Sequence, residues 1–210
     1  MSFKKNNFLV IKKAIDKELC NFLYNYMEIR KQAFDYLQKT RFLSPYDDSW
    51  GCMNDGQIPN TYSVYGDPAY ETLLVVLKDK IEEKSGFDLV EQYSYARRYK
   101  NGDVLARHTD REECTISATL HLGGDEWPIY LDVSGRVAQA GVKINLKAGD
   151  LLIYNGDKME HYREEFTGNN SNQVFLHYNE ISSTKKFDTR PMVGLPSEYK
   201  KDKDEFFPNN

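Results

Sequence analysis

The spacing of hydrophobic positions changes its period once along the chain. In the first part, residues 19–37 and 73–81 carry apolar side chains at helical spacing, which predicts two amphipathic helices. Asp16 precedes the first helix as a candidate N-cap, and Pro68 opens the second because its φ suits a first helical turn. Before both helices, the apolar run at residues 8–11 predicts a short buried strand.

From residue 89 onward, apolar and polar residues alternate with a period of two. Short segments of this kind follow one another between Gly-Asp, Gly-Gly, Ser-Gly and Gly-Asn turn signals, a spacing typical of a β-sandwich or barrel. The expected strands cover about residues 89–100, 104–110, 115–122, 128–133, 137–146, 150–156, 158–166 and 173–180. We expect residues 46–66 to form an irregular, aromatic-rich surface loop, because glycines and prolines interrupt any period there.

These patterns predict one domain of mainly β structure. A chain of 210 residues can bury about 70% of its unfolded surface, which is enough for a core without disulfides. Residues 1–88 supply the first strand and the supporting helices, and residues 89–181 form the core. Residues 182–210 are a polar tail that we expect to wrap the core loosely or to be partly disordered.

Composition narrows the range of partners. The net charge of −4 gives no basic field, so tight binding to long nucleic acid is disfavoured. The three cysteines are an odd number without a CxxC pair, which indicates reduced thiols in the cytoplasm. The apolar run at residues 8–11 is too short for a signal peptide or a membrane span, so no membrane partner is expected. The oligomeric state is left open.

The candidate chemistry lies at His108 and Asp110. Two residues apart on an extended chain, they project from the same face and can bind one metal ion. A second histidine would complete a 2-His-1-carboxylate triad, which favours Fe(II) and leaves positions for substrate and O₂. His161 follows a Gly-Asp turn, an apolar run and a second turn, so a paired strand can bring it beside His108.

Two other histidines compete for the third position. His177, with Arg190 downstream as a carboxylate partner, lies inside a continuous apolar strand without a turn before it. We therefore expect His177 to line the pocket or to be a buried structural histidine. A structural role is also favoured for His121, in mid-strand, and a packing role for Trp127.

The order of motifs around these residues resembles the 2-oxoglutarate- and Fe(II)-dependent oxygenases, particularly the prolyl 4-hydroxylase-like branch. The matching stretches, within residues 89–180, are Tyr99-Lys100-Asn101-Gly102-Asp103, His108-Thr109-Asp110, Leu120-His121-Leu122-Gly123-Gly124, Gly149-Asp150-Leu151-Leu152-Ile153-Tyr154 before His161, and Gln173-Val174-Phe175-Leu176-His177-Tyr178. The resemblance implies a double-stranded β-helix, or jelly roll, with iron bound by His108, Asp110 and His161.

The resemblance also implies a reaction. With O₂, 2-oxoglutarate is decarboxylated to succinate while a C–H bond of the substrate is hydroxylated, and ascorbate is a further candidate cofactor. Asp110 leaves no spare site for a halide, which favours hydroxylation over halogenation. The expected substrate is a prolyl residue of a protein or peptide, with a free amino acid or another small molecule as the alternative. A nucleic-acid demethylase is disfavoured, since that branch carries two arginines on the last strand and residues 173–179 contain none.

One position departs from the family pattern. The family usually places Arg or Lys at the start of the last core strand, where it binds the distal carboxylate of 2-oxoglutarate, and here that residue is Gln173. An amide is a weaker partner for a carboxylate than a bidentate cation. Arg163 is the expected substitute because it shares a strand face with His161. A surface arginine near Glu164 and Glu165 fits the sequence equally well.

The expected co-substrate contacts are thus Tyr99, Arg163 and Gln173, of which Tyr99 matches a family tyrosine. Arg97 is a second candidate cation, on the face of the strand that carries Tyr99. The neutral Gln173 also leaves a different class of function open, a metal-binding jelly roll of cupin type or an inactive binding module, neither of which uses 2-oxoglutarate.

Overall fold

The protein is described by a computed structural model for residues 3–44, 46–134 and 140–183. The described helices are α1 (Phe3–Asn6), α2 (Lys17–Lys39) and α3 (Pro68–Ser85). The described strands are β1 (Phe8–Ile11), β2 (Cys52–Asn54), β3 (Pro59–Tyr65), β4 (Leu89–Lys100), β5 (Leu105–His108), β6 (Ile116–Gly124), β7 (Ile129–Leu131), β8 (Val142–Ile144), β9 (Leu151–Tyr154), β10 (His161–Arg163) and β11 (Asn170–Glu180).

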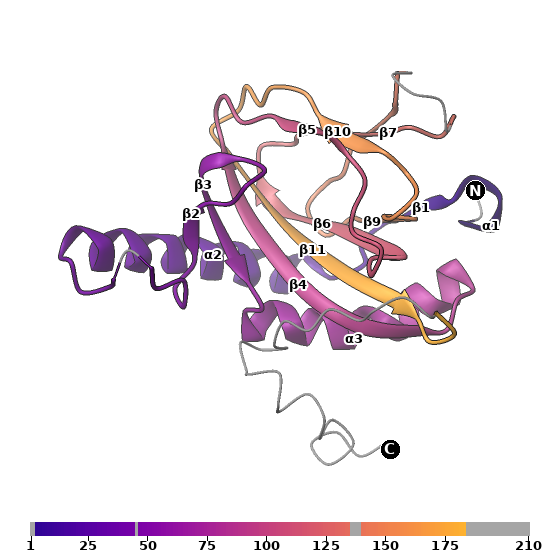
Figure 1. Ribbon diagram of the computed structural model, residues 1–210, viewed down its shortest axis with the longest axis horizontal. Coiled ribbons are helices and arrows are strands. Elements are labelled where there is room, and N and C mark those ends of the chain that lie inside the picture. The colour runs from indigo at the N-terminus through magenta and orange to yellow at the C-terminus, as the bar shows by residue number, and fades with distance from the viewer. Residues whose placement is uncertain (1–2, 45, 135–139, 184–210) are drawn as a thin grey trace, which may run out of the picture.

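The strands form two antiparallel sheets. The larger has seven strands in the order β1-β9-β6-β11-β4-β3-β2, and the smaller has four in the order β5-β10-β7-β8. Figure 1 shows the smaller sheet above the larger one, and α2 and α3 below the larger sheet. This is the mainly β architecture, a double-stranded β-helix with supporting N-terminal helices, that the sequence predicts.

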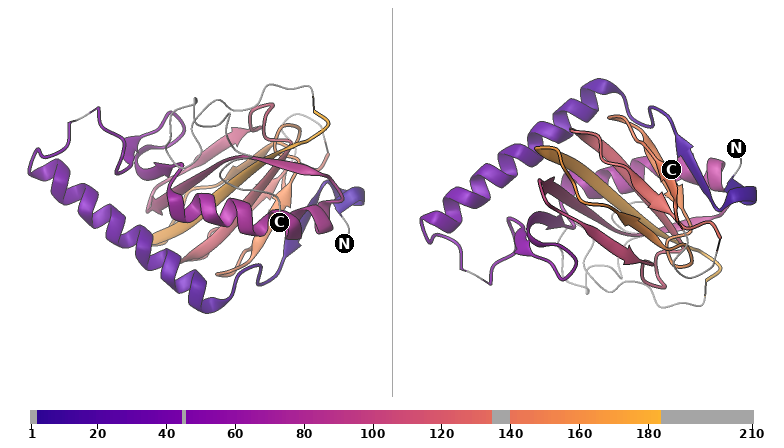
Figure 2. Two further views of the ribbon diagram at one scale, coloured as in Figure 1. Left: turned by 90° about the horizontal axis from the view of Figure 1, so that it is seen from below. Right: turned by 90° about the horizontal axis from the view of Figure 1, so that it is seen from above.

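Helices α2 and α3 lie across one face of the larger sheet (Figure 2). Both begin where an aspartate caps free backbone N–H groups: Asp16 accepts from the Leu19 amide at 2.8 Å, and Asp67 from the Ala69 amide at 2.9 Å. Their apolar residues share a core with the sheet, including Leu23, Met27, Leu74, Ile81, Ala118 and Leu176. Within the described residues, no helix has the length and apolar character needed to cross a membrane.

The other face of the larger sheet packs against the smaller sheet. Strand β9 shows how both faces are buried: Leu151 and Ile153 join the core beneath the helices, whereas Leu152 and Tyr154 pack with Ile129 and other residues between the sheets. A strand buried on both faces reads as a continuous apolar run, which explains the Leu-Leu-Ile-Tyr sequence. The space between the sheets also contains the predicted site.

Most predicted elements are confirmed, although the strands are generally shorter than expected. The prediction of an irregular loop at residues 46–66 is wrong, because β2 and β3 form there and β3 pairs with β4. The breakers Pro59 and Gly66 lie at the two ends of β3 and hide a short alternation of polar Thr61 and Ser63 with apolar Tyr62 and Val64. The tail from residue 184 and the start of the expected strand at 137–146 lie outside the described residues.

Candidate metal centre and its pocket

The structure brings His108, Asp110 and His161 together. One ligand atom from each lies within 4.8 Å of the others. The Nε2 atoms of His108 and His161 are 3.8 and 3.7 Å from Asp110 Oδ1. The cause is the strand register, because His161 at the start of β10 is paired directly with His108 at the end of β5. Two imidazoles and a carboxylate in this arrangement are a donor set that suits Fe(II).

Backbone carbonyls orient both imidazole rings. His108 Nδ1 lies 2.8 Å from the Ala106 carbonyl, and His161 Nδ1 lies 3.0 Å from the Met159 carbonyl. A carbonyl can only accept, so the network assigns the proton to Nδ1 and leaves a lone pair on each Nε2. The Tyr154 hydroxyl lies 3.3 Å from Nε2 of His161. Burial lowers the pKa of His161, which keeps that ring neutral. Both rings are therefore prepared as nitrogen donors toward one point.

Asp110 is held from the opposite side of the cluster. Its amide donates to the Gly156 carbonyl at 2.8 Å, and the Ser117 hydroxyl donates to Oδ2 at 2.6 Å, which leaves Oδ1 toward the histidines. Burial alone would raise the pKa of the Asp110 carboxyl, but electrostatic interactions with the nearby His161 and His177 rings and the Ser117 hydrogen bond bring it below its usual value. A Cβ at Gly156 would lie 2.6 Å from Asp110 Oδ2, so this approach requires glycine.

A cavity of about 360 Å³ opens at the three ligands. Strand β4 contributes Tyr93, Tyr95, Arg97 and Tyr99, which share a face because strand side chains alternate. Strand β11 contributes Phe175 and His177 in the same way, and the connection between β2 and β3 adds Asp55, Gly56 and Gln57. The cavity is therefore walled mainly by aromatic and polar side chains.

Arg163 lies inside the molecule, with 1% of its surface exposed. Its Nη1 donates to the Trp127 carbonyl, and its guanidinium lies 5.1 Å from the Trp127 ring centroid. Its Nε and Nη2 have no hydrogen-bond partner among the described residues. Burial lowers the pKa of Arg163 to about 10, against the opposing effects of Tyr99 and Tyr154, so it stays a cation at neutral pH. The surface salt-bridge interpretation is wrong, because this arginine is buried.

A buried cation without a counter-ion is unfavourable, so the surroundings of Arg163 fit an anionic group that reaches it. Tyr99, the second expected contact, borders the cavity and is fully buried. Its hydroxyl accepts a hydrogen bond from Arg97 Nη1 at 3.1 Å. The orphaned donors of Arg163 and the triad together form a set of residues that fits iron and a dicarboxylate.

Gln173, the third expected contact, faces the interior but already has partners. Its Nε2 lies 2.8 Å from His121 Nδ1 and donates to Ser171 Oγ at 3.1 Å, whereas Oε1 has no partner among the described residues. Burial lowers the pKa of His121, and the charge of Arg163 lowers it further. The Arg163 guanidinium therefore lies near His121 and the Gln173 amide that is hydrogen-bonded to it. Neither Arg163 nor Gln173 borders the open cavity.

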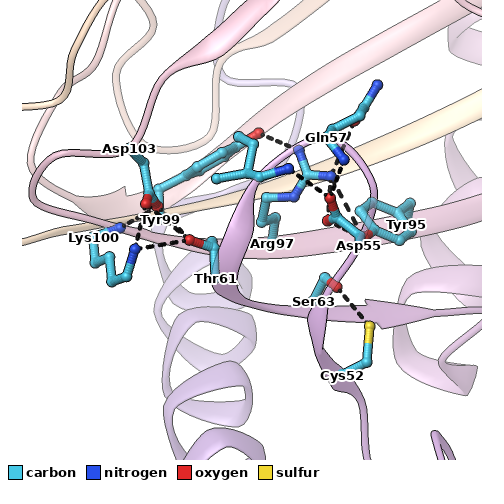
Figure 3. Close-up of polar contacts among 11 residues, drawn as sticks. Cys52, Asp55, Gln57, Thr61, Ser63, Tyr95, Arg97, Tyr99, Lys100 and Asp103 are labelled. Atoms are coloured by element: carbon cyan, nitrogen blue, oxygen red, sulfur yellow. Dashed lines mark hydrogen bonds and ion pairs between the residues drawn. The ribbon is translucent and has the colours of Figure 1, made fainter.

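Arg97, the second candidate cation, is already neutralised. Its Nη2 lies 2.5 Å from Asp55 Oδ2 and 3.1 Å from Gln57 Oε1, and Tyr95 donates to the same Asp55 oxygen at 2.7 Å (Figure 3). These contacts hold the β2–β3 connection against β4, where it forms one wall of the cavity. Sequence reasoning missed Asp55, since nothing in the local sequence links it to an arginine 42 positions away.

A second set of contacts in Figure 3 holds the end of β4 that follows Tyr99. Asp103 accepts from the Thr61 hydroxyl at 2.8 Å and from Lys100 Nζ at 2.5 Å. The motif residue Asp103 therefore has a structural role, which is to fix the turn between β4 and β5 and so the start of the strand that carries His108.

Similarity to known proteins is found only among solved structures. No protein-family model matches the sequence, and no curated protein resembles it. A prolyl-4-hydroxylase from Pseudomonas putida is similar with a TM-score of 0.59 and 15% identity over 85% of this chain and 95% of that one. A protein from Burkholderia pseudomallei of the 2OG-Fe(II) oxygenase family is similar with a TM-score of 0.55 and 13% identity over 84% and 86%. The fold is that of the 2-oxoglutarate- and Fe(II)-dependent oxygenases.

HygX from Streptomyces hygroscopicus, solved with nickel and 2-oxoglutarate bound, shares this oxygenase fold. The TM-score is 0.62, with 15% identity over 91% of each chain. HygX has also been solved with iron, and with nickel, 2-oxoglutarate and hygromycin B.

Within the oxygenase fold, the remaining predicted residues take structural or lining positions. His121 is buried and bonded to Gln173, as its structural interpretation requires. Trp127 packs edge-on against Tyr99, with 4.7 Å between ring centroids. His177 borders the cavity and is not one of the clustered ligands.

Proposed function

We propose that this protein is an Fe(II)- and 2-oxoglutarate-dependent dioxygenase that hydroxylates a C–H bond. The observation that carries the proposal is the cluster of His108, Asp110 and His161, whose ligand atoms lie close together where they border a cavity. Iron and 2-oxoglutarate, when bound, supply the oxidising chemistry for the hydroxylation of an unactivated carbon. The oxygenase fold and the iron-bound and 2-oxoglutarate-bound forms of HygX support the assignment.

The residues of this chain would orient the reactants and keep water out. His108 and His161 each offer an imidazole nitrogen, and Asp110 offers a carboxylate oxygen. The unpaired donors of Arg163 support a role in binding the distal carboxylate of 2-oxoglutarate, together with Tyr99 and, as a neutral neighbour, Gln173. A guanidinium is well suited to a carboxylate because it donates in a planar, bidentate fork.

For the substrate we propose a prolyl residue of a protein or peptide. The aromatic rings of Tyr93, Tyr95 and Phe175 along the cavity suit an apolar five-membered ring, and the fold is shared with a prolyl-4-hydroxylase. A free amino acid or other small molecule is the alternative, since HygX binds hygromycin B. The net charge of −4 disfavours long nucleic acid, and we place the protein in the cytoplasm with reduced cysteines.

One observation favours a second function, that of a metal-binding jelly roll without 2-oxoglutarate chemistry. The position expected to hold a cation is the amide Gln173, and its donor is engaged by His121. The two functions differ in a product that is easy to measure. Only the dioxygenase forms succinate.

The test starts from the metal-free protein under argon, to which Fe(II), 2-oxoglutarate with and without ascorbate, and then O₂ are added. We expect slow succinate formation even without a prime substrate. Metal binding without any succinate would favour the binding module. For substrate identity, proteins of a host lysate are incubated with the active enzyme and searched by mass spectrometry for one added oxygen atom on proline.

A further inference from the structure

A chain of two hydrogen bonds connects Asp110 through Ser117 to His177, a histidine outside the metal cluster. Ser117 Oγ lies 2.6 Å from Asp110 Oδ2 and 3.0 Å from His177 Nδ1. Ser117 and His177 come from adjacent strands, β6 and β11, in which they are directly paired. Ser117 is fully buried, and His177 is 6% exposed.

The chemistry of the three groups sets the direction of these hydrogen bonds. A carboxylate only accepts, so the single proton of the Ser117 hydroxyl points to Asp110, and Ser117 Oγ accepts from Nδ1–H of His177. Burial lowers the pKa of His177 to about 4, which is consistent with a neutral ring that carries its one proton on Nδ1. The His177 ring rests on Tyr93, with 4.5 Å between ring centroids, which holds it in position.

The three metal-facing residues are therefore supported in two different ways. His108 and His161 are each oriented by a backbone carbonyl two residues earlier in the chain. Asp110 follows the end of β5, and side chains of the larger sheet hold its outer oxygen. The carboxylate is thus the ligand whose orientation depends on side chains of other strands, and through Ser117 on His177, 60 positions further along the chain.

We propose that Ser117 and His177 are positioning residues that hold Asp110 Oδ2, so that Oδ1 faces the metal, and that His177 acts through Ser117. The inference rests on the proposed function, because it assumes that the triad binds a metal. Partners that hydrogen-bond to ligating residues typically change metal affinity by about 10–100-fold. Gly156 supports this arrangement, because a side chain there would occupy the space of the Ser117 hydroxyl.

The test measures Fe(II) affinity of the full chain under argon, by competition with a chromogenic chelator. The variants are Ser117→Ala, His177→Phe and the double variant, with His177→Asn as the conservative change that keeps an N–H donor. Ser63→Ala is the matched control, because Ser63 is another buried serine of the same sheet and contacts Cys52. Thermal unfolding of each metal-free variant verifies that it folds.

We expect Ser117→Ala to weaken Fe(II) binding by about 10–100-fold and His177→Phe by a smaller factor. The double variant should bind no more weakly than Ser117→Ala, because the two residues act as one unit. His177→Asn should recover part of the loss, and Ser63→Ala should change nothing.

Affinities of Ser117→Ala and His177→Phe equal to that of the unaltered protein would overturn the inference. Independent, additive losses in the double variant would also overturn it, because His177 would then not act through Ser117. Failure of the unaltered protein to bind Fe(II) is a separate outcome, which contradicts the proposed function itself. If Ser117→Ala does not fold, the comparison of His177→Phe with His177→Asn decides the matter.

Discussion

His161 lies directly opposite His108 in the pairing of β10 with β5, and their ring centroids are 4.2 Å apart. Asp110 reaches the same point because its amide is bonded to the Gly156 carbonyl in the connection that leads to β10. The candidate metal centre therefore depends on one strand register. A slip of one residue would turn His161 to the other face of the sheet and separate the cluster.

We expect His108→Ala and Asp110→Ala each to abolish succinate formation, since two remaining ligands hold Fe(II) poorly. Succinate is measured with Fe(II), 2-oxoglutarate and O₂ present in excess. Glu126→Ala removes an exposed carboxylate and serves as the control, with unchanged turnover. Activity retained in either ligand variant would mean that the metal site has been assigned to the wrong residues.

Arg163→Ala should raise the apparent KM for 2-oxoglutarate by at least about tenfold, because a charge-assisted hydrogen bond contributes about 1.5–3 kcal/mol. Arg163→Lys should have an intermediate effect, as an ammonium keeps the charge but not the planar fork. Arg98→Met is the matched control, since Arg98 pairs with Glu28 outside the cavity. An unchanged KM in Arg163→Ala would show that another group binds the distal carboxylate.

The burial of Arg163 also leads to a prediction about thermal stability. Arg163 is buried, and two of its donors have no hydrogen-bond partner in the part of the chain that the structure describes, so its replacement by methionine removes an uncompensated charge from the interior. We expect metal-free Arg163→Met to unfold at the same or a higher temperature than the unaltered protein, even though it binds 2-oxoglutarate more weakly. A clear loss of thermal stability would indicate that Arg163 is mainly a structural residue.

The lowered pKa of His121 should make the stability of the fold depend on pH. Its pKa falls from 6.5 to about 4, first because burial disfavours the charged ring and further because Arg163 is near, while Asp150 opposes the shift. Between these values the unfolded chain takes up a proton that the folded chain does not, so stability decreases as the pH falls. The contribution of His121 to the slope approaches about 1.4 kcal/mol per pH unit.

This dependence can be measured by urea unfolding of the metal-free protein between about pH 7 and about pH 4.5. His161 and His177, whose pKa values are also lowered, contribute in the same window, so the effect of His121 is read from the difference between the unaltered protein and a His121 variant. His121→Gln should lose less stability over this range than the unaltered protein, because glutamine does not titrate. Parallel curves for the two proteins would contradict the assigned pKa shift.

The ion pair of Asp55 with Arg97 should determine how firmly the β2–β3 connection closes the cavity. Asp55→Ala leaves the buried guanidinium of Arg97 without its carboxylate, at an expected cost of about 3 kcal/mol in unfolding free energy. Amide hydrogens of residues 55–58 should then exchange faster. The double change of Asp55→Leu with Arg97→Met should recover part of the stability, whereas no recovery would mean that the pair contributes little.

Local patterns in the sequence were sufficient for most of the elements and for the clustering of His108, Asp110 and His161. The helical spacing after Asp16, the proline at position 68 and the alternation beyond residue 89 each depend on contacts between near neighbours in the chain. His108 and Asp110 share a face for the same reason. His161 could be placed because turns and strand length limit where a paired strand returns.

Only the tertiary structure decided which charges are paired and which are not. Arg163 is compatible with a surface position in the sequence, yet it is buried with free donors, while Arg97 is neutralised by Asp55. His177 likewise meets Ser117, which holds Asp110, only because β6 and β11 lie side by side. Hydrogen bonds and ion pairs require their atoms within a few ångströms, and for residues distant in sequence that proximity is set by strand register and packing.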